Sequence, residues 1–364
     1  MARPQPKEGV LRVTPYAGSE AKPGAGQLIN ISSNESAFGA SARAREAFTE
    51  AAADLRRYPE IDARSLRQAL AAHYDLEPEG IICGTGSDQI IDLIALAYAG
   101  VGDEVVYSAH GFQMYPIAAH AVGATPVASP EVNLTTDVDA ILDAVNQRTR
   151  IVFLANPNNP TGTFVSRSEL ARLHAGLPGD VLLVIDSAYA EYVSHADYEP
   201  GIELARAHDN VVMTRTFSKI YALASLRVGW AYGPSEIIGI LDRIRPPFNV
   251  NAPAIAGAIA ALGDRDHTEN ARRHNDDVMP WFTSEVEALG LTVNPSVANF
   301  VIVHFDPDTP KNAEAAYQYL FDQGIVTRRV GGYGLPDWVR MSIGTREEMT
   351  TVRNALKGFL EKND

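Results

Sequence analysis

The sequence predicts an α/β protein: a large domain with a mostly parallel central sheet flanked by helices, followed by a smaller α+β domain. Its 364 residues are more than one hydrophobic core usually absorbs, which favours two domains. Between about residues 41 and 235, helical patterns alternate with short apolar runs rich in β-branched residues. Such runs are typical of strands buried on both faces of a parallel sheet.

The expected elements of the first part follow in a regular order. The first 40 residues are rich in Pro, Gly and Ser and show no sustained period, so we expect an extended arm. Helices are expected over 63–74 and 87–99, where apolar residues recur at helical spacing. The expected strands of the large sheet are 104–107, 150–154, 181–185, 211–214 and 228–231.

Helix caps and a change of pattern complete the expected fold. Asp137, and Ser166 with Glu169, have the pattern of helix N-caps. After about residue 248, an Ala-rich segment from 252 to about 275 predicts a connecting helix. We then expect strands over 299–305 and 338–343 and a last helix that begins at the capping pair Thr345 and Glu348. The expected units are an N-terminal arm (1–40), a large domain (41–248) and a small domain (249–364).

Composition and charge exclude several classes of function. The net charge is −14, and no cluster of Lys and Arg offers the concentrated positive charge that holds a nucleic-acid backbone. No apolar run is long enough to span a bilayer, and the first residues lack the apolar stretch of a signal peptide. Cys83 is the single cysteine, so no intrachain disulfide can form. We expect a cytoplasmic enzyme for small molecules, with no nucleic-acid, membrane or metal partner.

Unusual polar side chains follow three of the expected strands. Asn156 follows one strand, Asp186 and Tyr189 end the next, and Lys219 lies just beyond the third. In open α/β sheets, ligands bind beyond the carboxyl ends of the strands. Taken singly, each residue has an ordinary explanation as a cap, a turn residue or a solvated charge. If the three strands are neighbours, the four side chains converge on one crevice, and their joint placement predicts a site there.

Six motifs, spread over nearly the whole chain, have the residues and order of one enzyme family. They are NPNNPTG (156–162), DSAY (186–189), TFSKIYALASLRVGW (216–230), PPFNVN (246–251), NFVIVHF (299–305) and GYGLPDWVRMSIGT (332–345). In these motifs the chain resembles the fold-type I aminotransferases, which use pyridoxal 5'-phosphate. LRRYPE (55–60) and the last motif are similar to the histidinol-phosphate aminotransferase branch. The resemblance implies the fold-type I architecture of a large and a small domain.

The resemblance implies catalytic roles for residues at the strand ends. Lys219 would bind the aldehyde of the cofactor as a Schiff base, since an amine forms a reversible imine, and the freed amine would then carry a proton. Asp186 would pair with the pyridine nitrogen and keep it protonated. Tyr189 and Asn156 would donate hydrogen bonds to the phenolic oxygen of the ring, and Phe112 would stack on the ring face.

A cradle for the cofactor phosphate is also implied. The segment GTGSDQII (84–91) places Gly and Ser where a helix begins, and the free N–H groups there favour an anion. Arg227 is suited to a forked contact with phosphate. Tyr58 matches a tyrosine that reaches the phosphate from the neighbouring subunit, which implies a homodimer with shared active sites. The other implied ligands are Gly86, Ser87, Asp88, Thr216 and Ser218.

Four residues match family positions that contact the substrate. Arg340 matches the arginine that binds the acidic group of the substrate, and Arg328 is a second candidate ligand. Tyr16 and Asn34 match positions that line the pocket. The Asn-Glu-Asn-Pro stretch of the family is here Asn34-Glu35-Ser36-Ala37, a departure on the substrate side that removes no group needed by the cofactor.

The expected function is transfer of an amino group from L-histidinol phosphate to 2-oxoglutarate, in histidine biosynthesis. Arg340 would recognise a phosphate in one half-reaction and a carboxylate in the other. An aminotransferase for aromatic amino acids or prephenate is the main alternative, and a phosphothreonine-type decarboxylase of the same superfamily is another. A non-catalytic, ligand-sensing module is disfavoured, because the implied catalytic set is intact and the first 40 residues cannot hold a helix-turn-helix.

Overall fold

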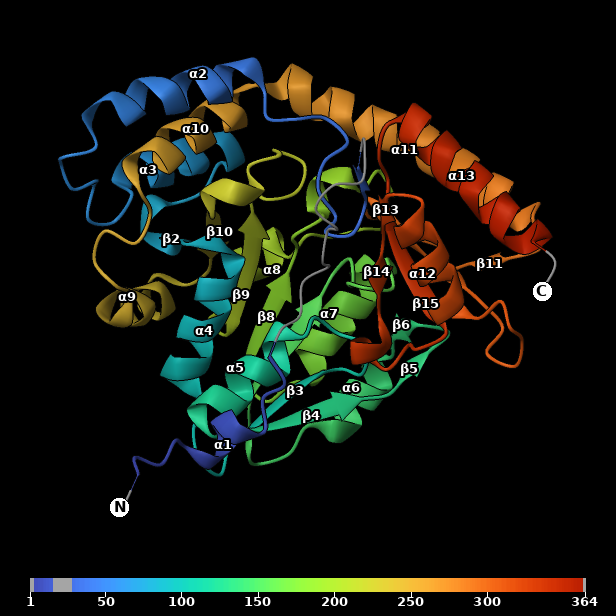
Figure 1. Cartoon of the computed structure of the whole chain (residues 1–364). Coiled ribbons are helices and arrows are strands. Elements are labelled where there is room, and N and C mark those ends of the chain that lie inside the picture. Colours follow the sequence, from blue (N-terminus) through green and yellow to red (C-terminus); the bar gives the residue numbers. More distant parts are fainter. Residues whose placement is uncertain (1–2, 16–27, 363–364) are drawn as a thin grey trace.

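The computed structural model describes residues 3–15 and 28–362. Its two main sheets are each covered by helices (Figure 1). The larger sheet has seven strands. In spatial order they are β2 (Ile81–Gly84), β10 (Gly229–Tyr232), β9 (Val211–Thr216), β8 (Leu182–Asp186), β7 (Thr149–Ala155), β3 (Glu104–Ser108) and β4 (Thr125–Ser129).

The larger sheet is mostly parallel, as the sequence predicts. β10 runs antiparallel to both β2 and β9, whereas the pairs from β9 through β8, β7 and β3 to β4 are all parallel. Strands β7, β8 and β9 are neighbours, so their carboxyl ends lie at one edge of the sheet. This adjacency is the condition on which the predicted crevice depends.

Helices on both faces bury these strands. One face packs against α4 (Gly86–Tyr98), α5 (Met114–Val122) and α9 (Ser235–Ile244). The helices on the other face are α2 (Ala42–Ala51), α3 (Arg64–Tyr74), α6 (Val138–Ala144), α7 (Arg167–Gly176), α8 (Ile202–Ala207) and α10 (Ala252–Gly263). Because both faces are covered, the central strands carry continuous apolar runs rather than alternating ones.

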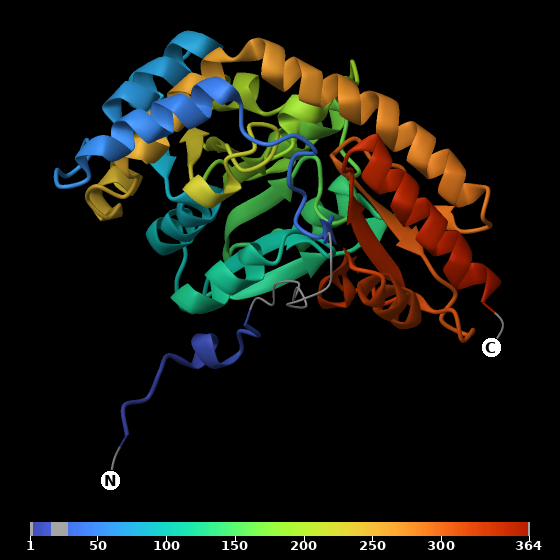
Figure 2. The ribbon, with the colours of Figure 1, turned by 45° about the horizontal axis from the view of Figure 1, so that its top comes forward.

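The smaller sheet is antiparallel and has its own core. Its strands are β11 (Thr292–Val293), β12 (Phe300–His304), β15 (Trp338–Ser342) and β14 (Arg328–Arg329). The helices that pack with it are α11 (Arg265–Glu287), α12 (Ala313–Asp322) and α13 (Arg346–Glu361). Figure 2 shows α11 running from the side of the larger sheet to the smaller one, with α13 beside it.

Most predicted elements are confirmed, with ends that differ by at most two residues. Thr345 and Glu348 form both halves of the predicted capping box, and the side chain of Asp137 caps α6. Ser166 accepts a hydrogen bond from the backbone of Glu169, which caps α7. The predicted connecting helix is two helices, α10 and α11, because the backbone leaves the helical region at Asp264.

The described parts of the N-terminal segment contact the regions of both the larger and the smaller sheet. A short helix, α1 (Glu8–Leu11), packs on α5, and β1 (Ile29–Asn30) pairs in parallel with β13 (Ile325–Val326). The division at residues 40 and 248 stays a proposal, since α10 follows 248 in sequence and packs on α2 and α3. No helix of the described ranges is long and apolar enough to cross a membrane.

Candidate active site

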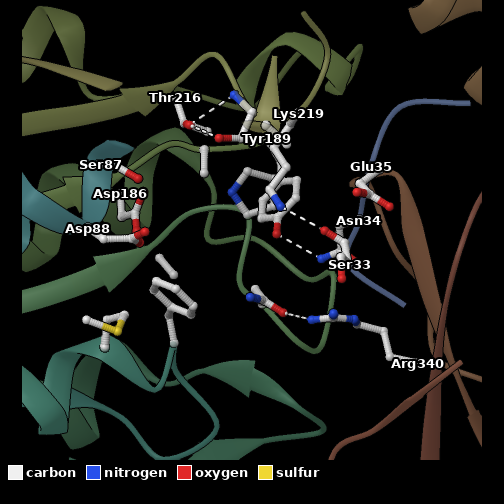
Figure 3. Close-up of a pocket in the computed structure, with 18 of the residues that line it drawn as sticks. Ser33, Asn34, Glu35, Ser87, Asp88, Asp186, Tyr189, Thr216, Lys219 and Arg340 are labelled. Atoms are coloured by element: carbon white, nitrogen blue, oxygen red, sulfur yellow. Dashed lines mark hydrogen bonds between the residues drawn. The ribbon is translucent and has the colours of Figure 1, made fainter. Parts of the chain in front are cut away.

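A cavity of about 380 Å³ lies where β7, β8 and β9 end, between the larger sheet, the arm and the smaller sheet (Figure 3). Asp186, Tyr189 and Lys219 all line it, so the structure brings these three predicted residues together. The other predicted residues in its wall are Asn34, Ser87, Asp88, Phe112, Thr216, Ser218, Arg227, Arg328 and Arg340.

Lys219 lies in the loop that follows β9, with its amine in the cavity. Its Nζ donates a hydrogen bond to the carbonyl of Ser33 at 3.0 Å. Burial, and after it the nearby positive charge of Arg340, lower the pKa of this amine to about 8. A substantial fraction of the amine is therefore unprotonated near neutral pH, which is the form that attacks a carbonyl carbon.

Asp186 is the last residue of β8 and is buried at the floor of the cavity. The hydroxyl of Tyr115 donates to its Oδ2 at 2.9 Å, and that of Thr214 donates to its Oδ1 at 3.1 Å. Thr214 is its register partner on β9, which explains the second contact. Burial raises the pKa of Asp186 to about 6, and the two donors oppose this. Such a carboxylate is suited to pair with a cationic nitrogen of a ligand.

The N-terminus of α4 and Arg227 form a place for an anion. Arg227 donates to the hydroxyl of Ser218 at 3.2 Å and pairs with the carboxylate of Asp88 at 2.8 Å. Gly86 has φ +77°, and a Cβ there would lie 2.3 Å from a guanidinium nitrogen of Arg227. The absence of a side chain at Gly86 therefore allows Arg227 to approach the N-terminus of the helix. Thr216 completes the group with a hydrogen bond to Ser218 at 3.0 Å.

Asn156 does not reach the cavity, and the contact expected of it with a ring oxygen is not supported. Its side chain is fully buried, where Oδ1 accepts from the backbone of Val165 at 2.9 Å and Nδ2 donates back to the carbonyl of Val165 at 3.4 Å. Asn159 lines the cavity instead, and its Oδ1 accepts a hydrogen bond from Arg340. NPNNPTG contains three asparagines, and their spacing does not indicate which one faces the cavity.

The substrate side of the cavity carries two arginines. Arg340, on β15, is 3% exposed and donates to Asn159 and to the carbonyl of Ser32, the latter at 2.7 Å. Arg328, on β14, is its register partner, and both line the cavity. Two guanidinium groups on adjacent strands can bind a phosphate or a carboxylate in forked geometry.

Tyr189 faces Lys219 across the cavity and is held by the arm. Its hydroxyl oxygen accepts a hydrogen bond from Nδ2 of Asn34 at 2.8 Å. Burial raises the pKa of Tyr189, so at neutral pH the hydroxyl is protonated and can donate to a ligand. Tyr16 lies outside the described residues. Tyr58 does not line this cavity; its side chain is 82% exposed and stacks on Phe248.

Comparison with known proteins identifies the family. Residues 26–356 match the family model "Aminotransferase class I and II". The chain belongs to this family. As an aminotransferase, it has the predicted fold-type I architecture, and the non-catalytic alternative is not supported.

Relatives of this aminotransferase are similar over their full length. A histidinol-phosphate aminotransferase of Paramagnetospirillum magneticum is 52% identical over 361 residues, 99% of each protein. One of Rhodospirillum centenum is 51% identical over 362 residues, 99% of this chain and 100% of that protein. The crystal structure of histidinol-phosphate aminotransferase from Sinorhizobium meliloti, in complex with pyridoxal-5'-phosphate, is 30% identical, with a TM-score of 0.90 over 97% of each chain.

Proposed function

We propose that the protein transfers the amino group of L-histidinol phosphate to 2-oxoglutarate in histidine biosynthesis, with pyridoxal 5'-phosphate as cofactor. One observation carries this proposal: Arg328 and Arg340, register partners on adjacent strands, line the same cavity as Lys219. Two relatives with about half of their residues identical over the full chain bear the name of this activity.

The residues of the cavity fit the cofactor. Its phosphate matches the N-terminus of α4 with Arg227, its ring nitrogen matches the buried carboxylate of Asp186, and its aldehyde matches the amine of Lys219. A Cβ at Gly229 would lie 2.2 Å from the backbone nitrogen of Ser87, so a larger residue would displace the anion-binding helix end. When bound, pyridoxal phosphate supplies an electron-withdrawing ring that stabilises negative charge on the substrate carbon.

Each side chain has a task toward that ring. Lys219 would hold the cofactor, and its amine, which lies in the cavity, would move the proton of the substrate α-carbon. Asp186 would keep the ring nitrogen protonated, and Phe112, which lines the cavity, would cover the ring face. Tyr189 and Asn159 are placed to donate hydrogen bonds to the phenolic oxygen.

The low pKa of Lys219 leads to a prediction for cofactor binding. We expect the rate at which cofactor-free protein reacts with pyridoxal phosphate to rise with pH and to level off above about pH 8, because only the neutral amine attacks the aldehyde. Arg340→Gln removes a positive charge near the amine, so the midpoint should move to higher pH. Stopped-flow absorbance measures the rate at each pH, and so the midpoint for the wild-type protein and for the variant. A rate independent of pH between 6 and about 9 would contradict the assignment of the amine.

The substrate is tested by comparing amine donors. With 2-oxoglutarate as acceptor, we expect kcat/KM for histidinol phosphate to exceed those for phenylalanine and tyrosine by about 100-fold or more, since a site built for a phosphate discriminates strongly. Prephenate, a keto acid, is assayed as the acceptor with glutamate as the donor, and its kcat/KM should be lower by a similar factor. Arg340→Gln should lower kcat/KM for the donor and for 2-oxoglutarate alike. A higher value for an aromatic substrate would replace the proposed donor and favour the alternative activity.

The proposed assembly is a homodimer with shared active sites. Tyr58 and Phe248 stack with ring centroids 4.7 Å apart, and Leu55 and Ile61 nearby are 71% and 53% exposed. An exposed apolar patch of this kind is typical of a protein interface. Tyr58 would reach the cofactor phosphate of the second copy, as the family resemblance implies. A cytoplasmic location stays a prediction.

A further inference from the structure

Residues 32–35 of the arm form a strap that contacts both sides of the active site (Figure 3). The carbonyl of Ser33 accepts from Lys219, and that of Ser32 accepts from Arg340. The third contact is made by a side chain, because Nδ2 of Asn34 donates to the hydroxyl oxygen of Tyr189 at 2.8 Å. Asn34 therefore touches one of the groups proposed to contact the cofactor ring.

The orientation of the Asn34 amide is fixed by Ser342 of β15. The hydroxyl oxygen of Ser342 accepts from the backbone N–H of Asn34 at 2.8 Å, and its proton is donated to Oδ1 of Asn34 at 3.2 Å. With Oδ1 engaged in this way, Nδ2 is the end that faces Tyr189. Asn299 also donates to the Asn34 carbonyl at 3.1 Å, and the backbone of Asn34 has φ +57°. Asparagine tolerates this left-handed conformation better than most residues.

This arrangement directs the one proton of the Tyr189 hydroxyl. Nδ2 of Asn34 is a donor and cannot accept a hydrogen bond, so the hydroxyl of Tyr189 does not donate to it. The proton of this hydroxyl is therefore available on the cavity side. Hydrogen bonds in a buried chain also polarise one another, so Tyr189 becomes a stronger donor. Asn34 and Ser342 are 1% and 3% exposed, so water does not compete for these contacts.

We propose that Asn34 is a positioning residue that acts through Tyr189, holding its hydroxyl as a donor to the phenolic oxygen of the bound cofactor and so easing loss of the proton at the lysine–cofactor bond. This role rests on the proposed function. A donor to the phenolic oxygen withdraws negative charge that otherwise attracts that proton, so the deprotonated form is favoured. The same strap receives hydrogen bonds from Arg340 and Lys219, which ties the substrate side to the reacting side.

The test is the pH titration of the absorbance of bound pyridoxal phosphate. Asn34→Ala should raise the midpoint by roughly half a pH unit, the effect of one neutral hydrogen bond on a titrating group. Asn34→Asp should raise it further, because a carboxylate can only accept and would draw the tyrosine proton away. Asn294→Ala is the matched control: this buried asparagine donates to the carbonyl of Thr161 at 2.9 Å, and its variant should titrate as wild type.

A double-mutant cycle separates this role from a general structural one. In a Tyr189→Phe background, Asn34→Ala should cause no further shift, since the hydroxyl through which it acts is gone. An equal shift in both backgrounds, or an unchanged midpoint in Asn34→Ala alone, overturns the proposal. If Asn34→Ala does not fold, Ser342→Ala should shift the midpoint in the same direction. Failure of the wild-type protein to bind pyridoxal phosphate would instead overturn the proposed function.

Discussion

Replacing Lys219 with Ala is expected to lower kcat by at least about 10⁴-fold, because the variant loses both the covalent holder of the cofactor and the amine that moves the proton. The anion site at α4 and Arg227 remains, so pyridoxal phosphate should still bind, though without a covalent bond. Turnover is measured with histidinol phosphate and 2-oxoglutarate, and binding by equilibrium dialysis.

A control variant at another lysine tests whether the fall in kcat is specific to Lys219. Lys357 lies on α13, where its half-exposed side chain pairs with Glu361. Lys357→Ala should keep wild-type kcat. If Lys219→Ala turned over substrate within about tenfold of wild type, another group would have to carry the proton, and the proposed chemistry would be wrong.

Asp186→Asn should lower kcat/KM by about 10³-fold and at the same time stabilise the cofactor-free protein. Activity falls because a neutral amide does not hold the ring nitrogen protonated, and loss of one preorganised electrostatic partner has effects of this size. Stability rises because the buried carboxylate of Asp186 ionises less readily in the folded state, where its pKa is raised to about 6.

The sign and pH range of the stability change follow from that raised pKa. Above about pH 6 the folded protein carries an unfavourable buried charge, so Asp186→Asn should gain about 3 kcal/mol in free energy of unfolding. The gain should shrink as pH falls below 6 and vanish near the pKa of the unfolded chain, about 4. Urea unfolding of cofactor-free protein at pH 8 and pH 5 measures it. Asp180→Asn, at a side chain 78% exposed, should change neither property.

The fold was largely predictable because buried parallel strands carry a strong pattern. β7 and β8 consist mostly of continuous apolar runs and β9 begins with one, and the carboxyl ends of these strands lie at the cavity. The edge strand β4 was not predicted, since Thr125 and Ala128 are exposed and it includes Pro126, which an edge strand tolerates. The break at Asp264 was missed because Ala-rich and charged segments on either side both favour a helix.

Site residues at or just after the end of a predicted strand could be predicted from the sequence. Contacts between residues that are distant in the sequence could not. Asp186 and Lys219 have that placement. The choice between Asn156 and Asn159 depends on how the loop turns, which spacing does not reveal. Tyr115, which holds Asp186, lies 71 residues before it and meets it only through the packing of α5 on the sheet.

The covalent bond between Lys219 and the cofactor is tested most directly by trapping it. Protein incubated with pyridoxal phosphate is treated with borohydride, which converts the bond to a stable amine, and is then digested and sequenced by mass spectrometry. We expect the adduct on the ε-amine of Lys219, in the peptide that contains Thr216 and Ser218. An adduct on another lysine, or none at all, would contradict the assignment of the active site.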